Sequence, residues 1–231
     1  MFTKNTTARS FLLIAASMIG LLIGSFTTTS VHAVGDSPGT QNADTVVTFK
    51  SNGVQDGWIL ESGENTNAGG TLNNTATTLR LGDDVVRKQY QSILSFNTSS
   101  LPDNAVITRV TLKIKRHGII GGGNPLIAFQ GFMTDVRRGA FGTSALQLVD
   151  WKATANITLG PFTPTINSGW YALNVTSAKA HVNRLSTGGG LTQIRLRFQL
   201  NDNNNSVANI LILYSGNASA TFRPQLIVEY H

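Results

Sequence analysis

The chain has 231 residues, of which 41% are hydrophobic and only 13% are charged, with 23 glycines and no cysteine. Soluble domains usually contain about 25% charged residues, so turns and β-type surfaces are expected here rather than long charged helices. The lack of cysteine excludes a disulfide scaffold, a thiolate metal site and a cysteine nucleophile. Alternating apolar runs recur throughout the chain and argue against disorder.

The first 33 residues have the pattern of a secretory signal peptide. Lys4 and Arg9 provide positive charge, residues 11–24 form an uncharged apolar run, and Val31-His32-Ala33 supplies small residues at a cleavage site. The apolar run is short for a membrane span; an uncleaved N-terminal anchor is the alternative. We therefore expect a secreted or cell-surface protein that has no membrane span after cleavage and begins with a flexible leader over residues 34–43.

The charge of the mature chain narrows the class of partner. Without Lys4 and Arg9, 16 basic and 12 acidic residues remain, a net charge of +4. This is too small an excess to indicate a nucleic-acid partner. It permits attraction to an acidic polysaccharide or another anionic surface.

Residues 44–231 read as one all-β domain with no dividing linker. About ten short runs of β-branched and aromatic residues, separated by turn clusters, predict an antiparallel β-sandwich. The predicted strands are Thr45–Lys50, Trp58–Ser62, Thr77–Gly82, Lys88–Asn97, Val106–His117, Leu126–Met133, Trp170–Val175, Leu191–Leu200, Ile210–Ser215 and Gln225–Tyr230. Two short helices are expected, at Ser144–Ala155 and Ser177–Leu185.

Several motifs follow one another in a fixed order along this domain. They are the loop Glu64–Gly70, the strand end Leu79–Gly82, Phe96 with the Ser100-Leu101-Pro102 turn, the strand Ile107–Leu112, the element Trp170–Val175, the strand end Tyr214-Ser215-Gly216 and the closing segment Arg223–Tyr230. In order and spacing they resemble the DNRLRE-type carbohydrate-binding module of secreted and cell-surface bacterial and archaeal proteins. The resemblance covers nearly all of the mature chain.

The resemblance implies a jelly-roll β-sandwich that is secreted, non-catalytic and associated with polysaccharide. Some relatives are attached to alginate-degrading enzymes, which suggests acidic glycans as ligands. No ligand-contact residues are carried over from the family. The candidate site residues therefore come from this sequence alone.

Basic residues alternate with apolar ones along two of the predicted strands. Arg109, Lys113 and Lys115 lie on one of them, and Arg195 and Arg197 on the other. If both strands belong to one sheet, these cations form a patch suited to carboxylates or sulfates, because Arg binds a carboxylate with two hydrogen bonds and Lys adds a point charge. The alternative is an ordinary solvated sheet face.

Exposed aromatic rings are the second candidate feature, since sugar rings stack on them. Trp58 and Tyr90 share their strands' apolar positions and are expected in the core. Trp151 and Tyr171 are the aromatic residues expected at the surface.

A structural calcium ion is the third candidate, because hard cations bind several carboxylate and amide oxygens. The carboxylates placed to contribute are Glu61, Glu64, Asp83, Asp84 and Asp202. Asn- and Asp-rich segments also form turns without any metal, and no EF-hand spacing is present. No other cofactor is expected.

Catalysis has the least support. The mature chain contains no Gly-x-Ser-x-Gly, no His-Glu-x-x-His and no Walker loop, and its three histidines are widely separated. We therefore expect a non-enzymatic protein that binds acidic polysaccharide through its basic sheet face. The alternative is a self-associating structural or adhesive subunit of a surface layer, matrix or filament, favoured by a stand-alone domain that lacks an aromatic platform.

Overall fold

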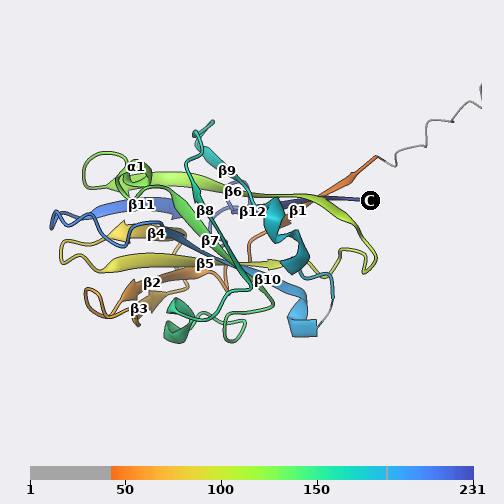
Figure 1. Cartoon of the computed structure of the whole chain (residues 1–231), viewed down its shortest axis with the longest axis horizontal. Helices are drawn as coiled ribbons and strands as arrows, with labels where there is room; N and C mark the ends of the chain where they lie inside the picture. The colour runs from red at the N-terminus through yellow and green to blue at the C-terminus, as the bar shows by residue number, and fades with distance from the viewer. Residues whose placement is uncertain (1–42, 186) are drawn as a thin grey trace, which may run out of the picture. The chain divides into compact units, whose positions relative to one another are not determined.

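Antiparallel strands are the main secondary structure of the computed structural model, which describes residues 43–185 and 187–231 (Figure 1). Twelve strands occur in these residues. They are β1 (Thr45–Lys50), β2 (Gly57–Glu61), β3 (Gly69–Asn73), β4 (Thr78–Asp83), β5 (Gln89–Asn97), β6 (Ile107–Ile120), β7 (Phe132–Arg138), β8 (Ile157–Phe162), β9 (Trp170–Asn174), β10 (Leu191–Phe198), β11 (Asn209–Tyr214) and β12 (Gln225–Tyr230).

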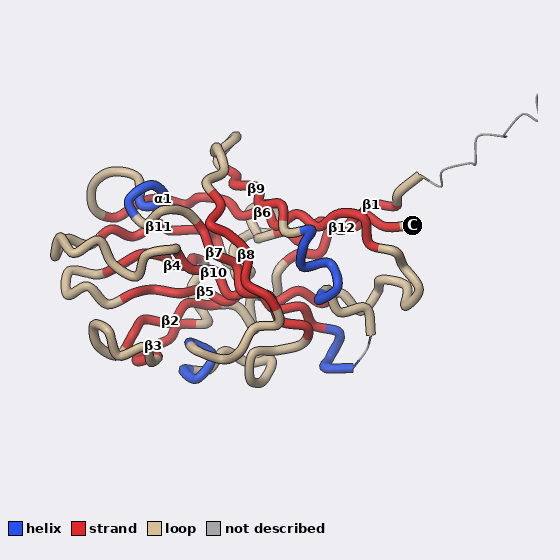
Figure 2. The backbone as a smooth tube through the Cα atoms, viewed as in Figure 1, coloured by secondary structure: helices blue, strands red, loops and turns tan. Residues whose placement is uncertain are grey.

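The strands form one curled sheet in the order β1-β12-β6-β11-β4-β5-β10-β7-β8. Off this path, β2 pairs with β5 and β3, and β9 pairs with β6. The 14-residue strand β6 belongs to both layers, since its first half pairs with β12 and its residues 116–120 pair with β11. The sheet therefore folds over on itself (Figures 1 and 2). This confirms the predicted all-β jelly-roll sandwich, with twelve strands rather than about ten.

The main core lies between the inner faces of the two layers. Strand β6 contributes Val110, Leu112 and Ile114, and β10 contributes Ile194 and Leu196, all at most 1% exposed. In each strand these residues alternate with polar ones, because successive side chains point to opposite sides of a sheet. Alternation of this kind predicted both strands from the sequence.

A second, smaller apolar cluster lies on the outer face of one layer. It joins Ile59 of β2 and Ile93 of β5 to Phe141, Leu146 and Trp151. The last three belong to the segment 139–156, which connects β7 to β8 along the chain. This segment covers part of the outer face of the sheet. This cover buries polar positions of β10 that would otherwise face solvent, so seven of the eight residues of that strand are buried.

Several local expectations were wrong. The run Leu126–Met133 is not one strand: Asn124 caps a short helix α1 (Pro125–Ala128), and β7 begins only at Phe132. Pro125 stands in the first turn of this helix, where its missing N–H costs nothing. Strands β3 and β8 were missed. The sequence pattern places Gly69 and Gly70 in a loop and predicts no strand between residues 156 and 169.

The remaining helical elements are single short turns. Helices were expected at Ser144–Ala155 and Ser177–Leu185. The structure has only short 3₁₀ helices there, η1 (Leu148–Trp151) and η2 (Thr176–His181). A third, η3 (Thr187–Gly190), occupies what was expected to be a glycine loop.

The N-terminal predictions are not addressed by this structure. The signal peptide at 1–33 and all but the last residue of the leader at 34–43 lie outside the described residues. Within the described residues, no helix is long and apolar enough to cross a membrane.

A buried carboxylate ties three distant segments together. The side chain of Asp56 accepts hydrogen bonds from the Ser51 hydroxyl, from the Ser95 N–H of β5 at 2.8 Å and from the Gly216 N–H after β11 at 2.9 Å. Burial raises the pKa of Asp56 to about 7, although the three donors act in the opposite direction.

This raised pKa predicts that neutral pH weakens the fold. A group that binds its proton more tightly in the folded state stabilises that state at low pH, and this contribution is lost as the pH rises from about 4 to about 7. The loss attributable to Asp56 is on the order of 4 kcal/mol. Guanidinium unfolding of Asp56→Asn at pH 4.5 and 7.5 should show a smaller difference in free energy of unfolding than the wild type. An unchanged difference would contradict this assignment.

Candidate functional site

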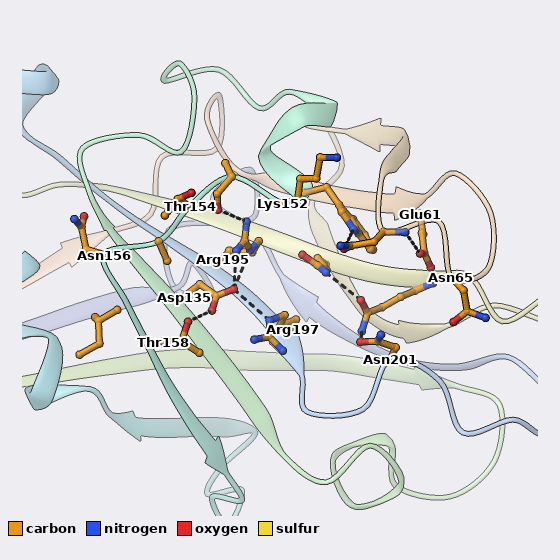
Figure 3. A pocket seen from close by; sticks show the side chains of 17 residues that line it. Glu61, Asn65, Asp135, Lys152, Thr154, Asn156, Thr158, Arg195, Arg197 and Asn201 are labelled. Carbon is orange, nitrogen blue, oxygen red and sulfur yellow. Dashed lines mark hydrogen bonds and ion pairs between the residues drawn. The ribbon is translucent and has the colours of Figure 1, made fainter.

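A polar groove of about 740 Å³ lies on the outer face of the layer that contains β2, β5, β10, β7 and β8. Strand residues form its floor, and loop residues form its walls (Figure 3). The lining includes Glu61, Asn65, Asn67, Gln89, Gln91, Asp135, Lys152, Thr154, Asn156, Thr158, Arg195, Arg197 and Asn201.

Arg195 fixes one wall of the groove to its floor. It stands opposite Asp135 in the β10–β7 pair, and its Nε and Nη2 both lie 2.9 Å from Oδ2 of that carboxylate. Its Nη1 donates to the backbone carbonyls of Asp150 at 2.7 Å and Ala153 at 2.9 Å. Its guanidinium also lies 4.8 Å from the centre of the Phe141 ring. Because one cation holds both sheet and segment, it sets where residues 150–153 lie.

Asp135 is shared by both arginines of β10. Figure 3 shows Arg195 and Arg197 reaching this carboxylate, with Arg197 Nε at 3.2 Å, while Thr158 of β8 donates its hydroxyl at 2.6 Å. Burial alone would raise the pKa of Asp135, but these three partners together hold it below its ordinary value. The group is therefore ionised at neutral pH.

A relay of side-chain amides crosses the floor. Gln91 donates to Oε1 of Gln89 at 3.0 Å, and Gln89 donates to Oδ1 of Asn201 at 3.3 Å. The relay leaves Oε1 of Gln91 buried with no hydrogen-bond donor from the described residues. Since Gln91 is only 7% exposed, this is a desolvated acceptor in the lining of an open groove.

Glu61, the last residue of β2, closes the end of the groove that lies on the side of β5 away from β10. Its carboxylate accepts the backbone N–H of Asn67 at 2.8 Å and that of Gln89 at 3.4 Å. Asn67 in turn accepts a hydrogen bond from the Trp151 indole at 3.3 Å. These contacts hold the 65–67 loop against the segment 139–156.

The five predicted cations do not form one patch. Strands β11, β4 and β5 separate β6, which carries Arg109, Lys113 and Lys115, from β10, which carries Arg195 and Arg197. Only the β10 pair lines the groove. Arg195 is 8% exposed and occupied by protein partners, so it is a structural residue rather than a free ligand contact.

The expectation that Trp151 and Tyr171 are exposed was wrong, since each is only 3% exposed. Trp151 is buried because η1 turns it onto Ile59 and Ile93 in the second cluster. Tyr171 points inward from β9, and its ring meets Phe132 edge-on at 5.2 Å. Neither ring offers a face to a sugar.

Each of the five predicted calcium ligands has protein partners of its own, and of these carboxylates Asp83 and Asp202 lie close enough to repel each other. Glu61 holds the 65–67 loop, and Glu64 pairs with Arg87. The other three accept backbone N–H groups: Asp83 from Asn203 and Asn209, Asp84 from Val86 and Lys88, and Asp202 from Asn204. Across residues 43–231 without 186, no three His, Cys, Asp or Glu side chains are grouped to hold a metal. The calcium site stays a prediction.

The sequence reading missed most of the groove. Gln89, Gln91, Asp135 and Lys152 were not singled out, although Gln89 and Gln91 alternate with Tyr90 and the inward positions of β5. That alternation was the available signal. No model of a protein family matches the chain, and a search of the curated proteins found no match. The DNRLRE resemblance stays a prediction.

Removal of the Arg195 side chain should destabilise the protein severely. Arg195→Ala strips a buried carboxylate of one partner and leaves two backbone carbonyls without their donor, which should lower the free energy of unfolding by about 3–5 kcal/mol. Arg138→Ala, an exposed arginine on the neighbouring strand, is the matched control and should change it by less than about 0.5 kcal/mol. Denaturant unfolding measures both. Equal effects would show that Arg195 does not hold the wall.

Proposed function

We propose that this chain is a secreted, non-catalytic domain that binds acidic polysaccharide in the groove. The observation that carries the proposal is the buried, donorless Oε1 of Gln91 in the groove lining. A buried acceptor left without a donor costs free energy. This oxygen has almost no accessible surface, so a sugar hydroxyl supplies the missing donor only once the Gln91 amide turns toward the groove. The signal-peptide pattern and the family resemblance support the secreted, sugar-binding assignment.

The dimensions of the groove suit a polymer. The floor crosses five adjacent strands, β2, β5, β10, β7 and β8. Neighbouring strands lie about 4.8 Å apart, so the four steps span about 19 Å. Several sugar units fit along this length. The polar lining offers amide, guanidinium and hydroxyl groups, which match sugar hydroxyls and carboxylates.

The free charge in the groove favours an acidic ligand. Lys152, Arg195 and Arg197 face Glu61 and Asp135, a net charge of +1 for the lining. Both carboxylates are already bound by N–H and O–H donors. Lys152 is exposed, and none of the described residues forms an ion pair with it. Its ammonium group is therefore available to a uronate carboxylate.

The same carboxylates support binding without catalysis. Glycoside hydrolysis requires one carboxyl group that carries a proton near neutral pH. The pKa of Asp135 is lowered rather than raised, as hydrogen bonds and two arginines outweigh its burial. Glu61 is engaged by two backbone N–H groups and positions the 65–67 loop.

Affinity electrophoresis tests the ligand class. The purified mature chain should be retarded in gels that contain alginate, pectate or a sulfated glycan, and the retardation should fall with added salt. Gels that contain neutral glucans should not retard it. No retardation in any gel would overturn the proposed function.

The Gln91 acceptor can be removed with little change of volume. Gln91→Met should weaken retention in alginate gels by roughly fivefold, because a neutral hydrogen bond contributes about 1 kcal/mol. Gln199→Met, an exposed glutamine just beyond β10 and outside the lining, should retain wild-type mobility. A Gln91→Met protein that is folded by circular dichroism and binds normally would contradict the role of Gln91.

Charge reversal at Lys152 separates a local contact from overall charge. Lys152→Glu should reduce retention in acidic gels by about tenfold, since it removes one attraction and adds one repulsion within the groove. Lys179→Glu makes the same change of net charge at an exposed position of η2, outside the groove. We expect it to have a much smaller effect. Equal effects of the two variants would show that the groove is not the binding site.

One observation favours a structural subunit as the second candidate function. Among the described residues, β1 pairs with β12 alone, and Val46 on this edge strand is 61% exposed. An unpaired strand edge can accept a strand from another copy. Concentration-dependent polymerisation, measured by light scattering without any glycan, would favour this alternative over the groove.

A further inference from the structure

A second basic surface lies on the outer face of the layer formed by β1, β12, β6 and β9. In one row across it, Lys50 stands opposite Gln225, Gln225 opposite Lys113, and Lys113 opposite Ala172. In the adjoining row, Lys115 stands opposite Trp170. Directly paired residues project from the same side of a sheet, so these side chains share one face. We call Lys50, Lys113, Lys115 and Trp170 the lysine face.

The ammonium groups of the lysine face gather around aromatic rings. Nζ of Lys113 lies 5.3 Å from the centre of the Trp170 ring, and Nζ of Lys115 lies 5.4 Å from it. Nζ of Lys115 is also 4.5 Å from the centre of the Phe222 ring. Lys50 donates to the carbonyl of Ala220 at 3.0 Å. The rings and the carbonyl hold the three cations in place without neutralising them.

No carboxylate offsets this charge. In the part of the chain that the structure describes, none of the three lysines forms an ion pair. The one ion pair on this face joins Arg109 to Glu229 at 3.7 Å. Two ammonium groups at one indole, without a carboxylate partner in the described chain, raise the positive potential of this surface, which attracts an anion. The lysine face thus presents three cations without ion-pair partners among the described residues, of which Lys50 is exposed and Lys113 and Lys115 are half-buried.

The lysine face and the groove lie on opposite sides of the main core. The inner face of the first layer contributes Leu112 of β6 and Leu226 of β12 to this core, and the second layer contributes Leu94 of β5 and Ile194 of β10. Both surfaces use the residues that alternate with these positions. They therefore point away from each other, and one polysaccharide segment cannot occupy both.

We propose that the lysine face is a second binding site for acidic polysaccharide, and that one protein molecule bridges two glycan chains. The inference rests on the proposed function of the groove and adds a second polysaccharide chain as a ligand. Repeating carboxylates along a polymer match the spread of the three ammonium groups over two neighbouring rows. With one site on each side, the protein cross-links the polysaccharide instead of only coating it.

A two-step capture assay with alginate tests the bridge. Beads that carry immobilised alginate are loaded with the purified mature chain, washed, and incubated with fluorescent alginate. Wild-type protein should bind the beads and capture the fluorescent chain. The Lys113→Ala/Lys115→Ala variant keeps an intact groove, so it should still load onto the beads. Its capture of the second chain should fall by about tenfold, since only one side remains.

Two further variants complete the design. Lys152→Glu should load onto the beads more weakly than the wild type, since only the lysine face then binds, and it should fail to capture a second chain. Arg116→Ala/Lys179→Ala, which removes the same amount of charge at exposed positions outside both sites, should bridge like the wild type. Light scattering in the absence of glycan must show monomers, because a dimer would bridge through two grooves.

The possible results separate the two proposals. Loading without capture by the wild type would overturn the second site and leave the groove proposal standing. Undiminished capture by Lys113→Ala/Lys115→Ala would do the same. A wild-type protein that does not load onto the beads at all would overturn the proposed function, and this inference with it.

Discussion

The buried pairing of Arg195 with Asp135 is the interaction on which the outer face of this domain depends. Arg195 joins β10 to β7 and also binds two carbonyls of the covering segment, so it fixes the sheet and its cover with one side chain. Without it, the carbonyls of residues 150 and 153 would face a buried carboxylate. The same ion pair positions the covering segment so that the groove stays open beside it, lined by Gln91 and Lys152.

This arrangement divides the outer face into a part covered by the second apolar cluster and a part that forms the solvent-exposed polar groove. Phe141, Leu146 and Trp151 cover the apolar positions Ile59 and Ile93. Beyond Trp151 polar residues alternate with Ala153 and Ala155, and the sheet beneath carries Gln89, Gln91 and Arg197 instead of apolar residues. A single sheet face thus acts as a core at one end and as a solvated groove at the other, because its sequence changes along the strands.

The sequence predicted the fold class well because alternation is a local property. Val110, Leu112 and Ile114 reveal their strand without reference to any neighbour. The candidate site was harder to predict, since Arg195 has the same alternating position whether its face is open or covered. Only the return of residues 139–156 onto the sheet decides between these cases, and that is a long-range contact. The same contact buries Trp151.

The pairing of β1 with β12 has a consequence for the order of folding. These strands come from opposite ends of the described chain, and β12 also supplies the partner for the first half of β6. One layer of the sandwich is therefore incomplete until residues 225–230 have been synthesised. Folds dominated by such distant contacts form slowly. The layer that contains β1 therefore cannot close until the last strand is available, and its completion is expected to be a late step in folding.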